Sequence, residues 1–207
     1  MTDTKDKILV AAEELIAEHG FEVATTRMIA KACGVNIAMI NYYFGGKEQL
    51  LEKLIEMRLA TFAGKVEEVS AASGSAYQKM ITIIDFYVDK LGGEVGRGRI
   101  IIRELDGMQR PRLAGMILES ISKNRQKVAG IIRDGIASGE FREADVELTT
   151  MTIYSVIYQF SHNPFYTNML IGDKTSTERF LDPEFHVRIK AFLKDLVANQ
   201  LLPHDKK

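Results

Sequence analysis

The chain has 207 residues, of which 46% are hydrophobic and 27% are charged, and its formal net charge is −1. This composition is typical of a globular protein with a buried core. It excludes a protein that binds nucleic acid through bulk positive charge, so any DNA-binding surface must be local. The single cysteine, Cys33, excludes an internal disulfide framework and favours a reducing compartment.

The N-terminal stretch is charged and amphipathic, without the apolar core and cleavage site of a secretory signal. No uncharged apolar stretch approaches about 18 residues, so we expect no membrane span and a location in the cytoplasm. The histidines and Cys33 lack the spacing of metal ligands. The sequence therefore predicts neither a metal site nor a cofactor.

Apolar residues recur at helical spacing along nearly the whole chain, and no strand-like alternation of useful length occurs, which predicts an all-α fold. Gly20, Gly34 and Gly45 follow the first three expected helices as C-terminal stops. Pro111 and Pro183 stand in the first turn of two later helices. In chain order, the expected helices span 5–18, 26–33, 37–44, 47–69, 76–91, 98–107, 111–138, 145–161 and 183–201.

Residues 25–44 predict two short helices joined by a tight turn. Thr25 or Thr26 can cap the first helix, Gly34 can supply the left-handed turn residue, and Asn36 can cap the second helix. We expect an inward face of Ile29, Ala30, Cys33, Ile40 and Phe44, and an outward face of Ile37, Ala38, Asn41 and Tyr42. This pattern is typical of a helix-turn-helix, whose second helix enters the major groove of DNA.

Phosphate contacts are expected on both sides of this motif. Thr26 and Arg27 stand at the start of one helix, where free backbone N–H groups attract an anion. Lys47 stands at the start of another helix, and Tyr42 and Tyr43 can donate phenolic hydrogen bonds to the DNA backbone. The first 60 residues contain seven Lys or Arg and nine Asp or Glu. Binding must therefore depend on where the cations lie rather than on net charge.

From about Ile8 to Leu51 the chain resembles the TetR family of regulators. The matching pieces are AAEELIAEHGFEVATTRMIAKACGV, INYYF at 40–44 and GGKEQLL at 45–51. The resemblance implies DNA contacts at nine positions, of which Asn41 departs from the tyrosine that the family often has. These positions are Thr26, Arg27, Ile37, Ala38, Met39, Asn41, Tyr42, Tyr43 and Lys47. Asn36, at the start of the second helix, is a further DNA-binding candidate.

The expected organisation is an N-terminal three-helix helix-turn-helix domain over residues 1–47, followed by a larger helical ligand-binding and dimerisation domain over 48–207. This second part carries aromatic and methionine side chains of the kind that line ligand cavities, although each can equally be ordinary core. Arg103, Glu104 and His162 can orient a polar ligand group or form ion pairs. The ligand-binding candidates are Tyr87, Arg103, Met108, Met116, Tyr154, Tyr158 and His162.

The last two long helices carry apolar residues on more than one side, more than one core face needs. This surplus predicts a homodimer through these helices, and the resemblance implies the same arrangement as a four-helix bundle. Such a dimer would meet a pseudo-palindromic operator with recognition helices about 34–36 Å apart or a multiple of that spacing. The residues in question are Ile153, Val156, Ile157, Phe160, Phe185, Ile189, Phe192, Leu193 and Leu196.

The sequence thus predicts a regulator that binds double-stranded DNA. Repression relieved by a small-molecule ligand is the mode that the resemblance implies. An activator, or a regulator that responds to a protein partner, stays open. An enzyme built on a helical bundle is disfavoured, because the sequence has no nucleophile–base pair, no Glu-x-x-His pattern and no phosphate-binding glycine loop.

Overall fold

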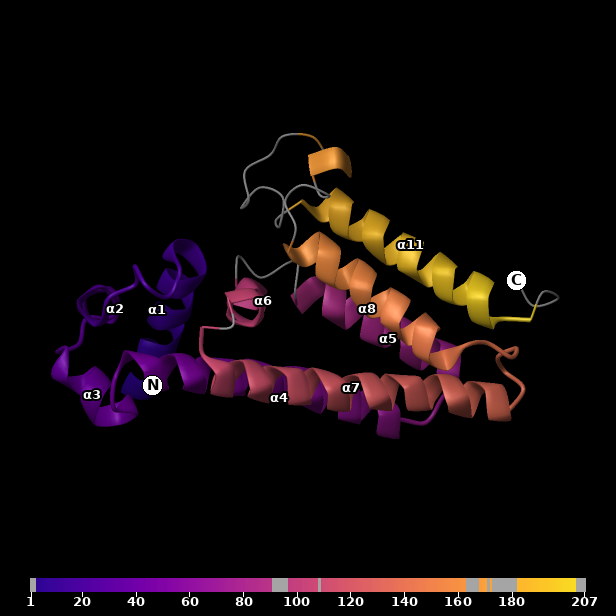
Figure 1. Ribbon diagram of the computed structural model, residues 1–207, viewed down its shortest axis with the longest axis horizontal. Helices are drawn as coiled ribbons and strands as arrows, with labels where there is room; N and C mark the ends of the chain where they lie inside the picture. Colours follow the sequence, from indigo (N-terminus) through magenta and orange to yellow (C-terminus); the bar gives the residue numbers. More distant parts are fainter. Residues whose placement is uncertain are drawn as a thin grey trace. The chain divides into compact units, whose positions relative to one another are not determined.

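The computed structural model describes residues 3–90, 97–107, 109–162, 168–170, 172 and 182–203. The described residues form helices, turns and loops with no β-strand among them, which confirms the predicted all-α class (Figure 1). The main helices are α1 (Thr4–His19), α2 (Thr26–Cys33), α3 (Ala38–Phe44), α4 (Lys47–Ala71), α5 (Ala76–Val88), α6 (Arg97–Gly107), α7 (Pro111–Ala137), α8 (Val146–His162) and α11 (Pro183–Leu201).

Capping side chains and glycines set the ends of several helices where the sequence predicts them. The Thr25 hydroxyl accepts a hydrogen bond of 3.2 Å from the Met28 N–H at the start of α2. The Asp182 carboxylate accepts the N–H groups of Glu184 and Phe185, with Pro183 in the first turn of α11. Most of the predicted loop 162–182 lies outside the described residues, although 168–170 form a helical turn.

The chain divides into two compact units, each of which is described by itself. The first unit contains Met1–Ala60 and Gly96–Ile117, and the second contains Thr61–Val95 and Leu118–Lys207. Helices α4 and α7 contribute residues to both units. The domain boundary expected after residue 47 stays a prediction.

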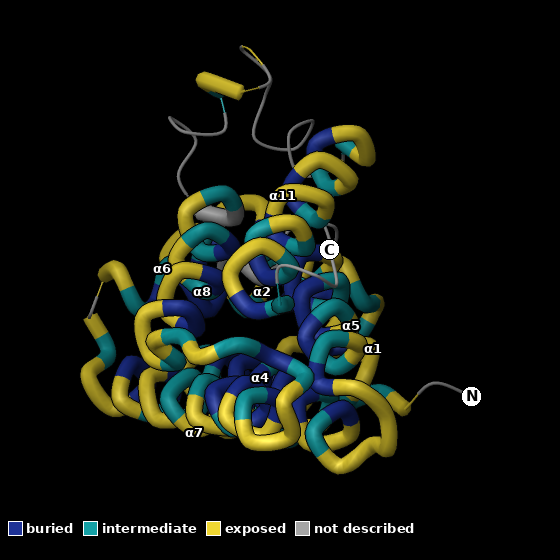
Figure 2. Tube along the Cα trace, turned by 90° about the vertical axis from the view of Figure 1, so that its right-hand side faces the viewer, coloured by how far each residue is buried: buried dark blue, intermediate teal, exposed yellow. Residues whose placement is uncertain are grey.

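In the first unit, α1 packs against α2 and α6. It buries Ile8, Ala12 and Ile16, which lie on one face because they are spaced at about one helical turn. Glu13 of α1 is also buried and forms an ion pair with Arg58 of α4. A buried carboxylate needs such a partner, because an unpaired charge in a protein interior is strongly destabilising. Figure 2 shows the resulting separation of buried and exposed sides along the helices.

In the second unit, α5 packs against both α8 and α11. The Glu140 carboxylate accepts the N–H groups of Ala76 and Tyr77 at 2.7 and 2.8 Å, and so caps the start of α5. Gly135 of α7 lies where a Cβ atom would meet the Ala76 Cβ at 2.9 Å and overlap the Phe141 ring. The close packing of α7 against Ala76 and Phe141 therefore requires glycine at position 135.

None of the described helices is both long and apolar enough to cross a membrane.

Candidate DNA-binding site

Helices α2 and α3 are joined by the tight turn that the sequence predicts. Gly34 has φ 68° and ψ 31°, the left-handed conformation that ends a helix, and the Val35 N–H returns to the Ala30 carbonyl oxygen at 3.0 Å. The Asn36 side-chain oxygen accepts the Ala38 N–H at 2.9 Å. The helix begins at Ala38 rather than at residue 37, so Ile37 is its N-cap and makes no side-chain cap bond, while Asn36, one residue earlier, satisfies the first N–H of the helix.

The two faces of α3 separate as the helical spacing predicts. Ile40 of α3 is fully buried, Ile29 and Ala30 of α2 are buried as well, and the two helices are in contact. Ile37 and Tyr42 are 45% and 79% exposed, and Ala38 and Asn41 are exposed as well. Cys33 and Phe44, expected to face inward, are only half-buried. The outer face of α3 is therefore a mixed apolar and polar surface suited to thymine methyl groups and base edges.

Two further α3 residues in the predicted contact set lie partly below this surface. Met39 and Tyr43 are half-buried. The rings of Tyr42 and Tyr43 meet edge to face with their centroids 5.1 Å apart. This contact restrains the exposed Tyr42 ring. At the start of α2, Thr26 is half-buried and Arg27 is exposed.

Lys47 occupies the first position of α4, directly after Gly45 and Gly46, which both have positive φ. Its ammonium group donates one hydrogen bond of 3.2 Å to the Glu22 carbonyl oxygen and lies 4.2 Å from the centroid of the Phe21 ring. An ammonium group has three N–H donors, so the contact with Glu22 leaves capacity for a phosphate. Backbone N–H groups in the first turn of α4 lack acceptors within the helix and can join that contact.

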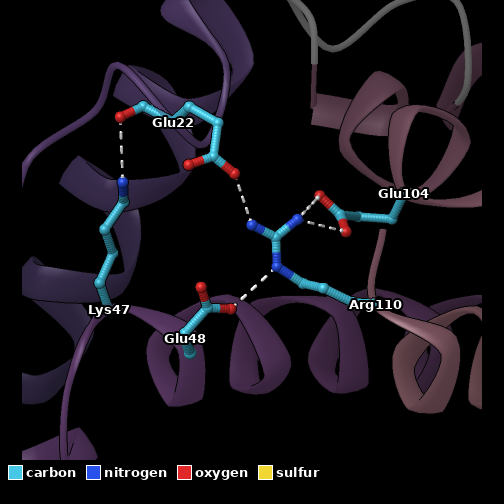
Figure 3. Close-up of polar contacts among 5 residues, drawn as sticks. All are labelled: Glu22, Lys47, Glu48, Glu104 and Arg110. Atoms are coloured by element: carbon cyan, nitrogen blue, oxygen red, sulfur yellow. Dashed lines mark hydrogen bonds and ion pairs between the residues drawn. The ribbon is translucent and has the colours of Figure 1, made fainter. Parts of the chain in front are cut away.

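Arg110 lies at the centre of a cluster of polar contacts in the same unit (Figure 3). Its Nε, Nη1 and Nη2 atoms donate to Glu48 at 2.8 Å, Glu104 at 3.0 Å and Glu22 at 2.7 Å, respectively. Burial alone would lower the pKa of Arg110, but its hydrogen bonds to Glu48 and Glu22 and the charge of Glu104 raise that pKa above its ordinary value. The guanidinium therefore stays charged and holds three acidic side chains from different segments.

The sequence did not reveal this cluster. Arg110 is 62 residues from Glu48 and 88 residues from Glu22 along the chain, and no helical periodicity links such positions. Phe21 was missed for a similar reason, since a single aromatic residue after a helix-ending glycine is unremarkable in a sequence. The available signal was weak: an arginine just before the proline that starts α7.

The ligand-binding candidates are not all brought together. Tyr87, Tyr154 and Tyr158 belong to the second unit, whereas Arg103 and Met116 belong to the first. Arg103 donates to the carbonyl oxygens of Ile16 at 3.4 Å and Ala17 at 3.2 Å, at the C-terminal end of α1. Met108 and the side chain of His162 lie outside the described residues. Contact of any of these residues with a ligand stays a prediction.

Tyr87 and Tyr154 do meet, in an aromatic part of the second unit. The Tyr154 hydroxyl donates to the Tyr87 oxygen at 3.3 Å, and the amide of buried Asn124 donates to the same oxygen at 3.5 Å. Phe62 lies against Tyr87 with a centroid distance of 5.1 Å. Burial raises the pKa of Tyr87. Burial and the neighbouring Tyr87 also raise the pKa of Tyr154.

Burial within one chain accounts for much of the apolar surplus on α8 and α11. Among the described side chains of these helices, the large apolar ones left exposed are Leu148 and Met151 of α8, and Val187 and Phe192 of α11. The surplus left for a dimer interface is therefore smaller than the whole set of apolar residues named from the sequence, because α5 packs against both helices. The buried members of that set are Ile153, Ile157, Phe185, Ile189 and Leu193.

The chain matches known families of bacterial regulatory proteins over both of its parts. Residues 8–54 match the family described as bacterial regulatory proteins, tetR family, and residues 73–162 match the tetracyclin repressor-like C-terminal domain. The chain is 30% identical over 153 residues to the fatty acid metabolism regulator protein of Bacillus subtilis, covering 73% of this chain and 78% of that protein.

Two solved structures share the fold over nearly the whole length. The regulator FadR of Bacillus subtilis in complex with stearoyl-CoA has a TM-score of 0.63 and 24% identity, and the match covers 91% of this chain and 96% of that one. AibR, solved with isovaleryl coenzyme A and operator DNA, has a TM-score of 0.69 and 16% identity, and the match covers 94% and 97%.

Proposed function

Because the chain belongs to the TetR family of bacterial regulatory proteins, we propose that it is a homodimeric repressor which binds a pseudo-palindromic operator through α3 and leaves it when an acyl-coenzyme A binds. Members of this family are DNA-binding transcriptional regulators rather than enzymes, which agrees with the sequence prediction. We expect this repressor to act in the bacterial cytoplasm, where its operator lies.

The observation that carries the DNA-binding proposal is the exposure of Tyr42 on α3 and of Ile37 at its N-cap, next to the fully buried Ile40. An outer face that combines exposed apolar and polar side chains is suited to thymine methyl groups and base edges. We assign base-edge contacts to Ile37, Ala38, Met39 and Asn41. We assign phosphate contacts to Thr26, Arg27, Tyr42, Tyr43 and Lys47.

The dimer proposal is supported by the apolar side chains that α8 and α11 leave uncovered. Leu148 and Val187 are each 66% exposed, and Phe192 is 53% exposed. Phe160 of α8 and Phe185 of α11 meet with ring centroids 5.8 Å apart, so these two helices can present one continuous surface to a second copy. A two-fold dimer matches the two half-sites of a palindromic operator.

The ligand proposal is supported by the relatives and by the chemistry of the second unit. The Bacillus subtilis relative is named for fatty acid metabolism, and FadR and AibR were solved with acyl-coenzyme A molecules. An acyl chain is suited to aromatic surroundings such as those of Phe62 and Tyr87. The Asn124 amide donates one N–H to Tyr87 and has a second N–H that can donate to a thioester carbonyl.

The test has two stages, which separate the DNA-binding proposal from the ligand proposal. An operator is first selected from a random pool of duplexes, and its binding is followed by fluorescence anisotropy. Stearoyl-CoA is then added, with coenzyme A and stearate as controls. We expect release of the operator by stearoyl-CoA alone, because a ligand shifts a two-state equilibrium only through differential affinity. Retention of DNA at saturating stearoyl-CoA would refute the ligand proposal and leave the DNA proposal intact.

A further inference from the structure

Arg110 connects three separate segments of the first unit through one side chain. Its guanidinium binds Glu48 in the first turn of α4, Glu104 of α6, and Glu22 in the segment between α1 and α2 (Figure 3). The Arg110 and Glu104 side chains are 19% and 9% exposed. Glu22 and Glu48 are instead 72% and 61% exposed. The cluster thus has one inner carboxylate and two outer ones.

The two outer carboxylates belong to residues that flank Lys47. Glu48 is the next residue in the chain, and the Glu22 carbonyl oxygen accepts the hydrogen bond of the Lys47 ammonium. Uncompensated carboxylates at this place would repel a DNA phosphate, because exposed charges within about 10 Å still interact at ordinary ionic strength. Arg110 offsets part of this negative charge, with one positive charge against three carboxylates, and draws the oxygen atoms of Glu22 and Glu48 toward its own guanidinium.

Phe21 gives Arg110 a second connection to Lys47. The Arg110 guanidinium carbon lies 4.0 Å from the centroid of the Phe21 ring, and the Lys47 ammonium lies 4.2 Å from the same centroid. Phe21 itself is buried. A planar guanidinium can stack on a ring while its edges hydrogen-bond to carboxylates, which a lysine ammonium cannot do. Arginine therefore suits this position for reasons beyond its charge.

We propose that Arg110 is a positioning residue of the DNA-binding surface, which holds Phe21 and Glu22 against the Lys47 ammonium and offsets part of the charge of the two acids beside it. Arg110 does not touch DNA in this account. It acts through Lys47, whose predicted phosphate contact depends on the place of its ammonium group. The inference rests on the proposed binding of an operator by α3 and the start of α4.

The test compares Arg110→Met and Arg110→Lys with a charge-matched control, Arg112→Met. Arg112 is two residues away, 87% exposed, and paired with Glu52. Operator affinity is measured by anisotropy over a range of salt concentrations, and circular dichroism gives the folded fraction of each variant. We expect both Arg110 variants to bind about tenfold more weakly than the wild type, since they lose several charge-assisted hydrogen bonds. Arg112→Met should bind as the wild type does.

The salt dependence separates positioning from a loss of stability. If Lys47 loses its phosphate, the slope of log affinity against log salt becomes shallower by about 1. A smaller folded fraction would leave that slope unchanged. Equal affinity and slope in the Arg110 and Arg112 variants would overturn the inference. Should Arg110→Met fail to fold, Arg110→Lys decides alone, and wild-type binding by that variant overturns the inference. Failure of the wild type to bind any duplex would instead overturn the proposed function.

Discussion

The high exposure of Tyr42 indicates that this residue serves binding rather than folding. It is 79% exposed, and its described ring contact is the edge-to-face pair with Tyr43. A side chain so little buried contributes little to folding, since stabilisation follows the apolar area removed from water. Its aromatic ring and hydroxyl are nevertheless directed outward from a helix that has the geometry of a recognition helix.

We therefore expect Tyr42→Ala to weaken operator binding at least about tenfold while lowering the free energy of unfolding by less than about 1 kcal/mol. Anisotropy and urea denaturation measure the two quantities. Val10→Ala is the matched control, because Val10 is also an exposed apolar residue, at 48%, in the same unit. A variant that loses stability and affinity together would contradict the assignment of Tyr42 to the DNA surface.

Tyr87 and Tyr154 make a prediction about pH. Burial raises the pKa of both hydroxyls above the ordinary value of 10.0. A tyrosine whose folded-state pKa is raised stabilises the protein fully below pH 10, and this contribution is lost as the pH rises above that value, because the unfolded chain ionises first. The free energy of unfolding should thus fall more steeply between pH 10 and 11 in the wild type than in a Tyr87→Phe, Tyr154→Phe variant.

Urea denaturation at intervals from pH 8 to 11 measures this difference. The other tyrosines are present in both proteins, so they do not contribute to the difference between the two curves. Parallel curves for the two proteins would show that the hydroxyls are accessible to hydroxide in the folded state.

The residue roles that could be predicted are those set by local helix geometry. Ile40 and Tyr42 lie on opposite faces of α3, because residues two positions apart point in nearly opposite directions on a helix, and the structure confirms it. The role of Arg110 could not be predicted, because its partners come together only through tertiary folding. Arg103 shows the same limit: its contacts with the end of α1 join residues 86 and 87 positions apart.

At the scale of helices, most ends were predictable because short-range chemistry sets them. Thr25, Gly34 and Asp182 act at their own helix termini, and their effect needs no distant partner. The side of α8 and α11 that faces the core was harder to predict from the sequence. Both helices pack against α5 and bury several of the apolar residues whose surplus predicts a dimer interface.

Helix α7 offers a matched pair of glycines for testing the packing. A Cβ at Gly135 would lie 2.9 Å from the Ala76 Cβ and overlap the Phe141 ring, whereas a Cβ at Gly130 meets nothing within 4 Å. Gly135→Ala should therefore destabilise the protein by about 1–3 kcal/mol through overpacking. Gly130→Ala should stabilise it by about 0.5–1 kcal/mol, because glycine is unfavourable in a helix.

Thermal unfolding followed by circular dichroism compares the two variants directly. If both alanines shifted the transition in the same direction, the close contact between Gly135 and its neighbours would not exist in solution.

At the scale of the whole molecule, the proposed dimer can be tested with two residues of similar exposure. Phe192 of α11 is 53% exposed and lies on the proposed interface, while Leu118 of α7 is 50% exposed and lies outside it. We expect Phe192→Glu to give a monomer and to weaken operator binding strongly, because burying a charge at an apolar interface is costly and one copy meets only one half-site.

Sedimentation velocity reports the oligomeric state, and Leu118→Glu should remain a dimer. Dissociation of both variants, or of neither, would contradict the assignment of the interface to the exposed faces of α8 and α11.

The central claim is that a domain with more acidic than basic residues binds DNA by the placement of a few groups around α3. The most direct test is the affinity of the wild type and Lys47→Ala for a selected operator and a scrambled duplex as a function of salt. We predict clear preference for the operator and a log–log slope shallower by about 1 in Lys47→Ala. Absence of salt-sensitive binding to either duplex, or identical slopes for the two proteins, would contradict it.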